Sequence, residues 1–409
     1  MKKTIWIINE YAGSPYHGVE LRHYYLGKEL IKRGYKVYII TASYSHLFIN
    51  PPKICDKFYF ENIDGINYIW TKVPIYKHSQ DKKRVLKWFV FTYKILFNLP
   101  VDKMDKPDVI LVSSTVPFPI IAGYKWAKYF NSKLIYEVKD IWPLTLVELG
   151  NYSSYHPFIK FMEIFEKFAY KVSEKVVSVL PLAYKHMQKQ GMKLEKFVYI
   201  PNGIYIEDLK NIENEDISDL LSFIPRNKFI VAYAGNFGVA NALSTLIESA
   251  RLLKNKEDIH FILIGKGSEE EKLKKFVEIY KLKNVTFLPY QPRRKVLKFL
   301  KECVNICYKG SPKLNIYRFG ISPRKIFEYM FIEKPIVHSY SGNCDLVKLA
   351  NCGVSVEAEN PKEVAKAILK LYSLPKDKLL EMGRNGKQYL LKYHTYKVIT
   401  DKFEKEILR

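Results

Sequence analysis

The sequence predicts an α/β fold with two doubly wound parallel sheets in tandem. Its 409 residues suffice for two domains of ordinary size. Short apolar runs rich in β-branched residues alternate with longer helical patterns, and this alternation occurs twice. A polar stretch over residues 207–219 separates the two series. Strands that alternate with helices form parallel sheets covered on both faces, so each series predicts one such domain.

The first series ends at Pro201-Asn202-Gly203 and predicts six strands with helices between them. The strands are expected near Thr4–Ile8, Lys36–Thr41, Val109–Val112, Lys133–Val138, Lys175–Leu180 and Phe197–Ile200. The helices are expected near 19–33, 117–129, 157–172 and 182–190. The apolar start of the chain is assigned to the first strand, because its run of about five apolar residues is too short for a secretory signal.

The second series repeats the pattern and predicts a second sheet. Its strands are expected near Phe229–Ala234, His260–Ile264, Val285–Leu288, Val304–Tyr308, Pro335–Ser339 and Gly353–Val356. Its helices are expected near 241–254, 269–280, 292–301, 323–331 and 361–372, followed by a helical tail.

These series divide the chain into an N-terminal domain over 1–205, a C-terminal domain over 206–385 and a C-terminal helix over 386–409. This C-terminal helix could cross back and pack on the N-terminal domain. Ligands bind at the carboxyl ends of strands in doubly wound sheets. We therefore expect the functional site in the cleft where the two domains face each other.

Composition limits the classes of protein that remain. A hydrophobic content of 48% excludes wholesale disorder. Five cysteines without CxxC spacing favour reduced thiols and a cytoplasmic setting over a disulfide scaffold or zinc site. The formal charge is +24, and residues 1–205 carry 30 basic and 17 acidic side chains. Because both halves share the excess, it favours anionic partners without choosing among phosphates, nucleic acid and membranes.

A glycine-bearing loop follows the first strand of each domain. Residues 13–18 (Gly13 to Gly18) come after the first strand, and Gly235-Asn236 comes after the first strand of the second domain. Such loops allow backbone amides to approach a phosphate at a helix N-terminus. An ordinary strand-to-helix turn is the alternative for each loop. A third loop carries Lys266, which could reach a phosphate, while Ser268 and Glu271 have the spacing of a capping box.

The segment 318–330 gives the sharpest prediction of a binding site. Ser322 suits the N-cap of a helix and Pro323 its first position, so Arg324 and Lys325 fall in the first turn. Cations are unfavourable in a first turn, because the helix dipole is positive there, unless an anion is bound. A bound diphosphate would explain why both Arg324 and Lys325 lie there. Glu328 lies one turn further on and could accept hydrogen bonds from ribose hydroxyls. The alternative is a surface helix on which Arg324 pairs with Glu328.

Charged residues at the end of another strand and an aromatic helix complete the candidates. Lys139 and Asp140 follow a buried strand, where Lys139 could neutralise a leaving phosphate and Asp140 could hold it or a sugar hydroxyl. A structural ion pair is the alternative. The basic aromatic segment 82–97 favours a helix on an anionic membrane, with a core helix as the alternative. No nucleic-acid module, metal motif or nucleophile motif occurs, and no apolar run is long enough to span a membrane.

At this level of detail the chain resembles the retaining glycosyltransferases of family 4, which have the GT-B fold of two Rossmann-like domains facing each other across a cleft. A closer likeness is to bacterial O-antigen and capsule transferases of the L-N-acetylfucosamine transferase type, on segments 137–149, 235–243 and 318–330. The resemblance runs along the whole chain and rests on motifs at residues 13–18, 137–143, 201–203, 233–236, 263–267, 284–289 and 322–328.

The resemblance implies roles for individual residues. It implies that Glu328 binds the nucleotide ribose and Lys325 the diphosphate, that Gly13 and Gly18 bring the first loop to the phosphates, and that the backbone of Leu288, Pro289 and Tyr290 flanks the base. Three positions depart from the family pattern: Gly320 stands where the family has the first glutamate of its E-x7-E motif, Lys139 where many members have histidine, and residues 236–243 lack the usual Arg and Lys.

The sequence therefore predicts a retaining glycosyltransferase that needs no metal or other cofactor. The resemblance implies a UDP-linked donor, with an N-acetylated sugar such as UDP-L-FucNAc as one option. It implies a polyprenyl-diphosphate-linked or growing glycan as acceptor, in cell-surface polysaccharide synthesis at the inner face of the plasma membrane. It places the acceptor and the membrane at the N-terminal domain and the donor at the C-terminal domain. The alternatives are a non-catalytic sugar-nucleotide-binding scaffold and a sugar-nucleotide epimerase of related fold.

Overall fold

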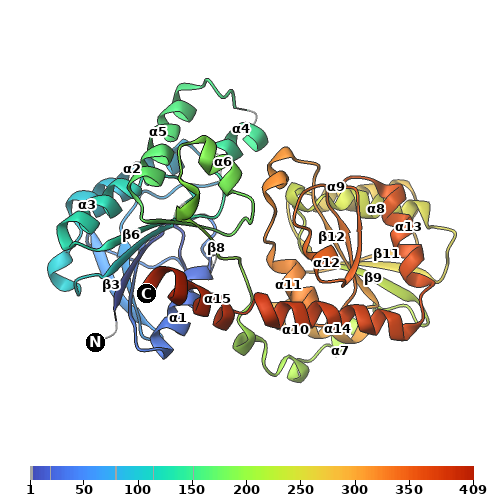
Figure 1. Ribbon diagram of the computed structural model, residues 1–409. Helices are drawn as coiled ribbons and strands as arrows, with labels where there is room; N and C mark the ends of the chain where they lie inside the picture. The colour runs from blue at the N-terminus through green and yellow to red at the C-terminus, as the bar shows by residue number, and fades with distance from the viewer. Residues whose placement is uncertain (1–2, 19, 79–80, 114, 151) are drawn as a thin grey trace. The chain divides into compact units, whose positions relative to one another are not determined.

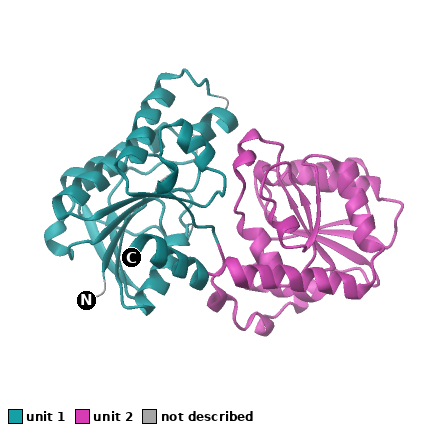
Figure 2. Cartoon of the chain, viewed as in Figure 1, with its two compact units in different colours: residues 1–202, 396–409 teal, residues 203–395 magenta. Residues whose placement is uncertain are grey.

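The computed structural model describes residues 3–18, 20–78, 81–113, 115–150 and 152–409. The chain forms two compact units (Figure 2). Unit 1 comprises Met1–Asn202 and Tyr396–Arg409, and unit 2 comprises Gly203–Thr395. Each unit is a sheet with helices packed against it (Figure 1), so the prediction of two doubly wound α/β domains is confirmed.

Unit 1 contains a sheet of eight strands in the order β3-β4-β2-β1-β5-β6-β7-β8. Its strands are β1 (Thr4–Ile8), β2 (Lys36–Ala42), β3 (Phe58–Ile63), β4 (Ile66–Thr71), β5 (Val109–Ser113), β6 (Lys133–Val138), β7 (Lys175–Ser178) and β8 (Phe197–Tyr199). All pairs are parallel except β3 with β4, which is antiparallel. The β1 side chains from Ile5 to Ile8 are fully buried, because helices cover both faces of this central strand.

The helices of unit 1 connect its parallel strands, except for the last α-helix, which follows the last strand of the chain. They are α1 (Arg22–Lys32), α2 (Lys82–Phe97), α3 (Ile120–Phe130), α4 (Leu144–Gly150), α5 (Pro157–Val172), α6 (Tyr184–Lys189) and α15 (Tyr396–Phe403), with a π-helical turn over Glu404–Leu408 and 3₁₀ turns at Val101–Lys103 and Leu194–Lys196. The first helix begins at Arg22 rather than near residue 19, a position that lies outside the described residues.

The sequence prediction missed the β3-β4 hairpin. Its two-residue turn is Asp64-Gly65, in which both residues have positive φ values of 50° and 86°. An Asp-Gly pair between two runs of alternating polarity is a strong signal for such a turn. The hairpin lies at the edge of the sheet, where β3 is half exposed, and its polar residues conceal the strand pattern.

Unit 2 contains six parallel strands in the order β11-β10-β9-β12-β13-β14. The strands are β9 (Phe229–Asn236), β10 (Ile259–Lys266), β11 (Val285–Leu288), β12 (Ile306–Gly310), β13 (Ile336–Ser339) and β14 (Gly353–Val356). The helices are α7 (Ser218–Leu221), α8 (Leu243–Leu252), α9 (Glu270–Ile279), α10 (Arg293–Cys303), α11 (Arg324–Phe331), α12 (Leu346–Leu349), α13 (Pro361–Tyr372) and α14 (Lys376–Tyr393), with 3₁₀ turns at Ile206–Leu209, Ile212–Asn214, Val239–Asn241 and Asn315–Phe319.

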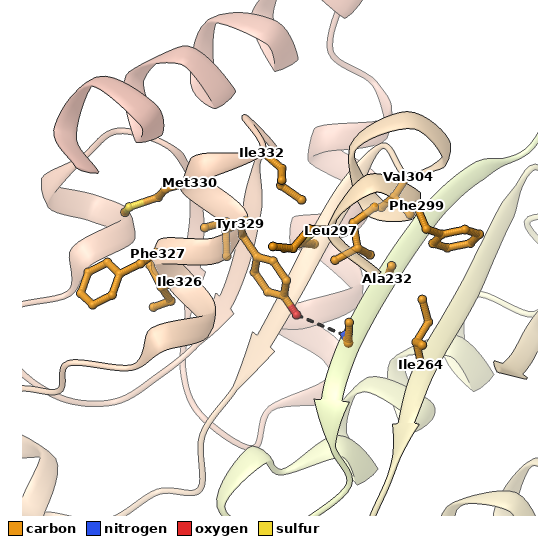
Figure 3. Close-up of a cluster of buried hydrophobic side chains, with 14 of the residues drawn as sticks. Ala232, Ile264, Leu297, Phe299, Val304, Ile326, Phe327, Tyr329, Met330 and Ile332 are labelled. Atoms are coloured by element: carbon orange, nitrogen blue, oxygen red, sulfur yellow. Dashed lines mark hydrogen bonds between the residues drawn. The ribbon is translucent and has the colours of Figure 1, made fainter. Parts of the chain in front are cut away.

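The core of unit 2 lies on both faces of this sheet, because alternate residues of each strand point to opposite sides. Along β9, Ala232 packs against α10 and α11, whereas Val231 packs against α8 and α13. Figure 3 shows the first of these two faces, on which Tyr329 of α11 points toward β9. The backbone amide of Ala234 donates a hydrogen bond of 3.2 Å to the Tyr329 hydroxyl. This contact holds the second turn of α11 beside the carboxyl end of β9.

The C-terminal segment packs on unit 1. Helix α14 belongs to unit 2 and ends at Tyr393, and α15 then lies beside α1 (Figure 1). Arg33 makes ion pairs of 2.7 Å with Asp401 and 2.9 Å with Glu404, which hold this segment to unit 1. The unit boundaries at Asn202 and Thr395 therefore differ from those expected at 205 and 385, and the tail consists of several helices rather than one.

Candidate nucleotide-sugar site

The carboxyl ends of β9 and β10 and the starts of α10 and α11 enclose a pocket of about 310 Å³ in unit 2. The pocket is lined by Ala234, Gly235, Asn236, Ile264, Gly265, Lys266, Tyr290, Gln291, Arg293, Val296, Leu297, Leu300, Lys325, Glu328 and Tyr329. It therefore brings together six of the residues predicted from sequence, namely Gly235, Asn236, Lys266, Tyr290, Lys325 and Glu328. The pocket has an apolar floor from α10 and charged side chains around it.

Lys325 reaches from the first turn of α11 to the end of β9. Its Nζ donates a hydrogen bond of 2.7 Å to the carbonyl oxygen of Ala234 and lies 5.2 Å from the centre of the Tyr233 ring. Burial lowers the pKa of Lys325, and the nearby Glu328 carboxylate opposes this shift. A β-carbon on Gly235 would lie 1.6 Å from the Lys325 Nζ, so only glycine leaves room for the ammonium.

Helix α11 begins one residue later than predicted. It begins at Arg324, and Pro323, which takes the N-cap position, makes no capping hydrogen bond with its own side chain. The expectation that Ser322 is the N-cap is therefore wrong. The capping box at Ser268 is also absent, since α9 begins at Glu270 without a side-chain cap. Lys325 remains in the first turn, as predicted, where the helix dipole adds to its positive charge.

Glu328 pairs with Arg293, which the sequence prediction did not include. The Arg293 Nε lies 2.6 Å from the Glu328 Oε1, and Glu328 is largely shielded from solvent. The alternative prediction, a pair between Arg324 and Glu328 on the helix surface, does not appear among the ion pairs of the described chain. A signal for Arg293 was present, since Arg293-Arg294-Lys295 places cations in the first turn of α10 as Arg324-Lys325 does on α11.

The remaining residues predicted in unit 2 lie at different depths. Lys266, the last residue of β10, is exposed and its Nζ lies 4.9 Å from the centre of the Tyr290 ring. Leu288 is buried in the core, and neither Leu288 nor Pro289 lines the pocket. Arg324 is exposed at the start of α11 and also lies outside the pocket lining.

In unit 1, the loop from Gly13 to Gly18 is closed by its own hydrogen bonds. The amide of Gly13 donates to the Glu20 carbonyl at 3.2 Å, and the amide of Gly18 donates to the Ser14 carbonyl at 2.8 Å. A β-carbon on Gly13 would lie 1.9 Å from the Gly18 carbonyl oxygen. The two glycines therefore make the tight crossing of this loop possible.

At the end of β6, Glu137 forms a fully buried network. Its Oε1 accepts a hydrogen bond of 2.9 Å from the Arg22 Nε, and its Oε2 accepts bonds of 2.8 Å from the His23 Nε2 and 2.5 Å from the Ser113 Oγ. Burial opposes ionisation, but Arg22 and His23 hold the pKa of Glu137 well below its usual range. Arg22 also donates to the carbonyl of Pro201 at 2.7 Å, and so ties β6 to the end of unit 1.

Lys139 continues this network. Its Nζ donates a hydrogen bond of 2.5 Å to Glu20, which also accepts one of 2.5 Å from Asn9. Burial raises the pKa of Glu20, but Lys139 and His23 outweigh it, and the pKa falls to about 2. The strand-exit ion pair expected as an alternative therefore exists, with Glu20 as the partner of Lys139. The side chain of Asp140 is exposed beside it.

Helix α2 of unit 1 has a divided surface. Trp88, Phe91 and Ile95 are buried, whereas Leu86, Phe89, Tyr93 and Phe97 are exposed on the opposite side. Phe161 and Ile164 on α5 are exposed as well, and the Phe161 ring lies 6.3 Å from that of Phe89. We call these six residues the α2–α5 stripe.

Within the described ranges, no helix has both the length and the apolar content needed to cross a membrane. The same residues contain no group of three or more His, Cys, Asp or Glu side chains arranged to hold a metal ion.

Comparison with known proteins agrees with this architecture. Residues 16–208 match the model of Glycosyltransferase Family 4, and residues 221–389 match that of Glycosyl transferases group 1. An Escherichia coli protein assigned to colanic acid biosynthesis as a glycosyl transferase, WcaI, is 24% identical over 269 residues, which are 64% of this chain and 65% of that protein.

Solved structures show the same fold over the whole chain. Sucrose-phosphate synthase from Thermosynechococcus elongatus has a TM-score of 0.74 at 15% identity, covering 99% of this chain and 98% of its own. HepE from Anabaena, solved with UDP and glucose, has a TM-score of 0.65 at 16% identity and full coverage of both chains. The chain thus belongs to the glycosyltransferases of the GT-B type, with a family 4 domain followed by a group 1 domain.

Proposed function

We propose that this chain transfers a sugar, with retained anomeric configuration, from a UDP-linked donor to a glycan acceptor. The observation that carries the proposal is the charge of the unit 2 pocket. Three cations, Lys266, Arg293 and Lys325, and one carboxylate, Glu328, line it. Their net charge of +2 complements the two negative charges of a nucleoside-diphosphate sugar, and the apolar floor suits a base.

In this proposal, Lys325 binds the diphosphate and stabilises the negative charge that develops as it leaves. Lys325 is suited to that role because it lies in a first helical turn, where the backbone amides also favour an anion. Glu328 accepts hydrogen bonds from the ribose hydroxyls, and Lys266 and Arg324 add positive charge nearby. The backbone of residues 288–290 flanks the base, and Asn236 lies beside the phosphates.

Unit 1 is proposed to bind the acceptor and to contact the donor near its leaving phosphate. Lys139, held by Glu20, would add positive charge near the leaving phosphate, and Asp140 would hold the phosphate or a sugar hydroxyl. The loop from Gly13 to Gly18 would approach the phosphates. Attack occurs on the same face as departure, and the departing phosphate oxygen takes the acceptor proton. Because lysine and arginine side chains supply the counter-charge, we expect no metal requirement.

The choice of partners rests on relatives and on one surface. HepE binds UDP and glucose, and WcaI is assigned to colanic acid biosynthesis, so we propose a UDP-sugar, with UDP-L-FucNAc as one candidate, and a polyprenyl-diphosphate-linked or growing glycan. The α2–α5 stripe, with Lys82, Lys83 and Lys160 exposed nearby in sequence, supports docking on an anionic membrane at the cytoplasmic face.

A panel of nucleotide-sugars tests the proposed function. Each donor is first ranked by thermal shift, and UDP release is then measured with and without lipid-linked acceptors. We expect stabilisation by one or a few UDP-sugars and UDP release that depends on the acceptor and persists in EDTA. Binding without turnover across a full acceptor panel would favour the sugar-nucleotide-binding scaffold, to which Gly320 in place of the family glutamate gives support. Interconversion of free UDP-sugars would favour an epimerase.

A further inference from the structure

Arg293 and Glu328 form a side-chain pair across two elements inside the unit 2 pocket. Arg293 is the first residue of α10, and Glu328 lies in the second turn of α11. Their contact of 2.6 Å joins the Arg293 Nε to the Glu328 Oε1. Only 15% of the Glu328 side chain is exposed, whereas 36% of the Arg293 side chain is, so the carboxylate is largely enclosed and the guanidinium closes it off from the solvent side. A charge-assisted bond in such a site is stronger than one at the surface.

The pair with Arg293 also keeps the Glu328 carboxylate away from Lys325. Lys325 lies three residues before Glu328 on the same helix, a spacing at which opposite charges attract. The Glu328 carboxylate accordingly raises the pKa of Lys325, against the lowering that burial causes. Without Arg293, the carboxylate would be drawn toward Lys325 and would partly neutralise it. With Arg293 in place, Oε1 is held and Oε2 remains to accept from hydroxyl groups.

We propose that Arg293 is a positioning residue for recognition of the nucleotide. It orients Glu328 toward the ribose hydroxyls and keeps that carboxylate from pairing with Lys325, so that the ammonium serves the diphosphate. The inference rests on the proposed function, because it assigns the ribose to Glu328 and the diphosphate to Lys325. It adds that discrimination between ribose and 2′-deoxyribose depends on a side chain of α10.

The test compares the binding of UDP and 2′-deoxy-UDP by titration calorimetry. Wild type should prefer UDP, and Arg293→Met should weaken UDP binding by about tenfold and reduce the preference toward one, since a carboxylate hydrogen bond is lost. Glu328→Gln should reduce the same preference for UDP over 2′-deoxy-UDP. The double variant Arg293→Met with Glu328→Gln should lose no more of that preference than the more affected single variant. Arg293→Lys provides a second variant that keeps the charge but not the geometry, and its preference should fall as well.

Lys295→Met is the matched control. Lys295 lies two residues further along α10, pairs with Asp219 at 2.7 Å and does not line the pocket, so its removal should leave both affinities unchanged. An unchanged UDP preference in folded Arg293→Met and Arg293→Lys overturns the inference alone. Equal losses for both ligands would mean that Arg293 contacts the phosphates directly, which also overturns it. Absence of UDP binding by wild type overturns the proposed function together with the inference.

Discussion

Replacing Gly235 by alanine should displace the Lys325 ammonium without removing it. The new β-carbon would lie 1.6 Å from the Lys325 Nζ and 2.5 Å from its Cε. The ammonium must therefore retreat by about 2 Å to restore an ordinary van der Waals contact. Because the obstructed atoms form the end of a flexible side chain, the protein can accommodate the change by moving Lys325.

The retreat sets the expected loss of affinity. Moving a unit charge from about 3 to about 5 Å from a phosphate charge, at an effective dielectric constant of about 20, removes about 2 kcal/mol of attraction. This corresponds to about a 30-fold weaker binding of UDP. Gly235 has a φ of 140°, which strains any larger residue, so the variant should also lose about 1–3 kcal/mol of stability.

Calorimetric titration with UDP, on protein shown to be folded, separates the two effects. Gly191→Ala is the matched control, since Gly191 lies in unit 1, has a φ of 93°, and no atom of the described residues would lie within 4 Å of an added β-carbon. It should lose stability and keep UDP affinity. In a Lys325→Ala background, Gly235→Ala should weaken binding by no more than about twofold, because the displaced ammonium is already gone. Wild-type affinity in Gly235→Ala, or a full additional loss in the Lys325→Ala background, would show that Gly235 does not act through the Lys325 ammonium.

Three further predictions concern stability and the surface. Burial lowers the pKa of Lys309, on β12, from 10.5 to about 7. Between these pH values the unfolded chain binds more protons than the folded one, so the stability of the fold rises with pH. The free-energy cost of burying the charged lysine is therefore complete below pH 7 and vanishes above pH 10.5. Lys309→Met should therefore raise the melting temperature at pH 7 and raise it less at pH 9; an equal gain at both values would contradict the assigned shift. Glu137→Gln leaves the buried Arg22 guanidinium without its counter-ion and should cost about 3 kcal/mol in urea unfolding; a cost as small as that of Glu195→Gln, a change at an exposed position of unit 1, would disprove the role of the pair. Leu86→Asp with Tyr93→Asp should abolish sedimentation with anionic vesicles at low salt; failure of wild type itself to sediment would remove the membrane proposal.

Much of the fold could be predicted because its causes are local. Each parallel strand reads as a short apolar run, and each crossover helix has its own periodicity, so both sheets follow from alternation. The β3-β4 hairpin was missed because its edge strand β3 is only half buried, although β4 is largely buried and Asp64-Gly65 marks the turn. The start of α11 was misplaced by one position, since Pro323 fits either the N-cap or the first turn.

The site could be predicted only in part, because its contacts join distant segments. Lys325 and Glu328 were found from charges that contradict the helix dipole, and both line the pocket. The partner of Glu328 lies 35 residues away on α10, and nothing in the local sequence of α11 selects Arg293 over Arg324. The partner of Lys139 lies 119 residues away, at Glu20, for the same reason. Pairing across elements depends on tertiary packing, which periodicity does not encode.

A crystal structure of the protein with UDP would reveal whether the unit 2 pocket binds the nucleotide. We expect the diphosphate in this pocket, with a phosphate oxygen within about 3.2 Å of the Lys325 Nζ and a ribose hydroxyl at a similar distance from Glu328. The Arg293–Glu328 contact should persist in that complex. UDP bound elsewhere, or bound in this pocket with its phosphates turned away from Lys325, would rule out the proposed roles of Lys325 and Glu328.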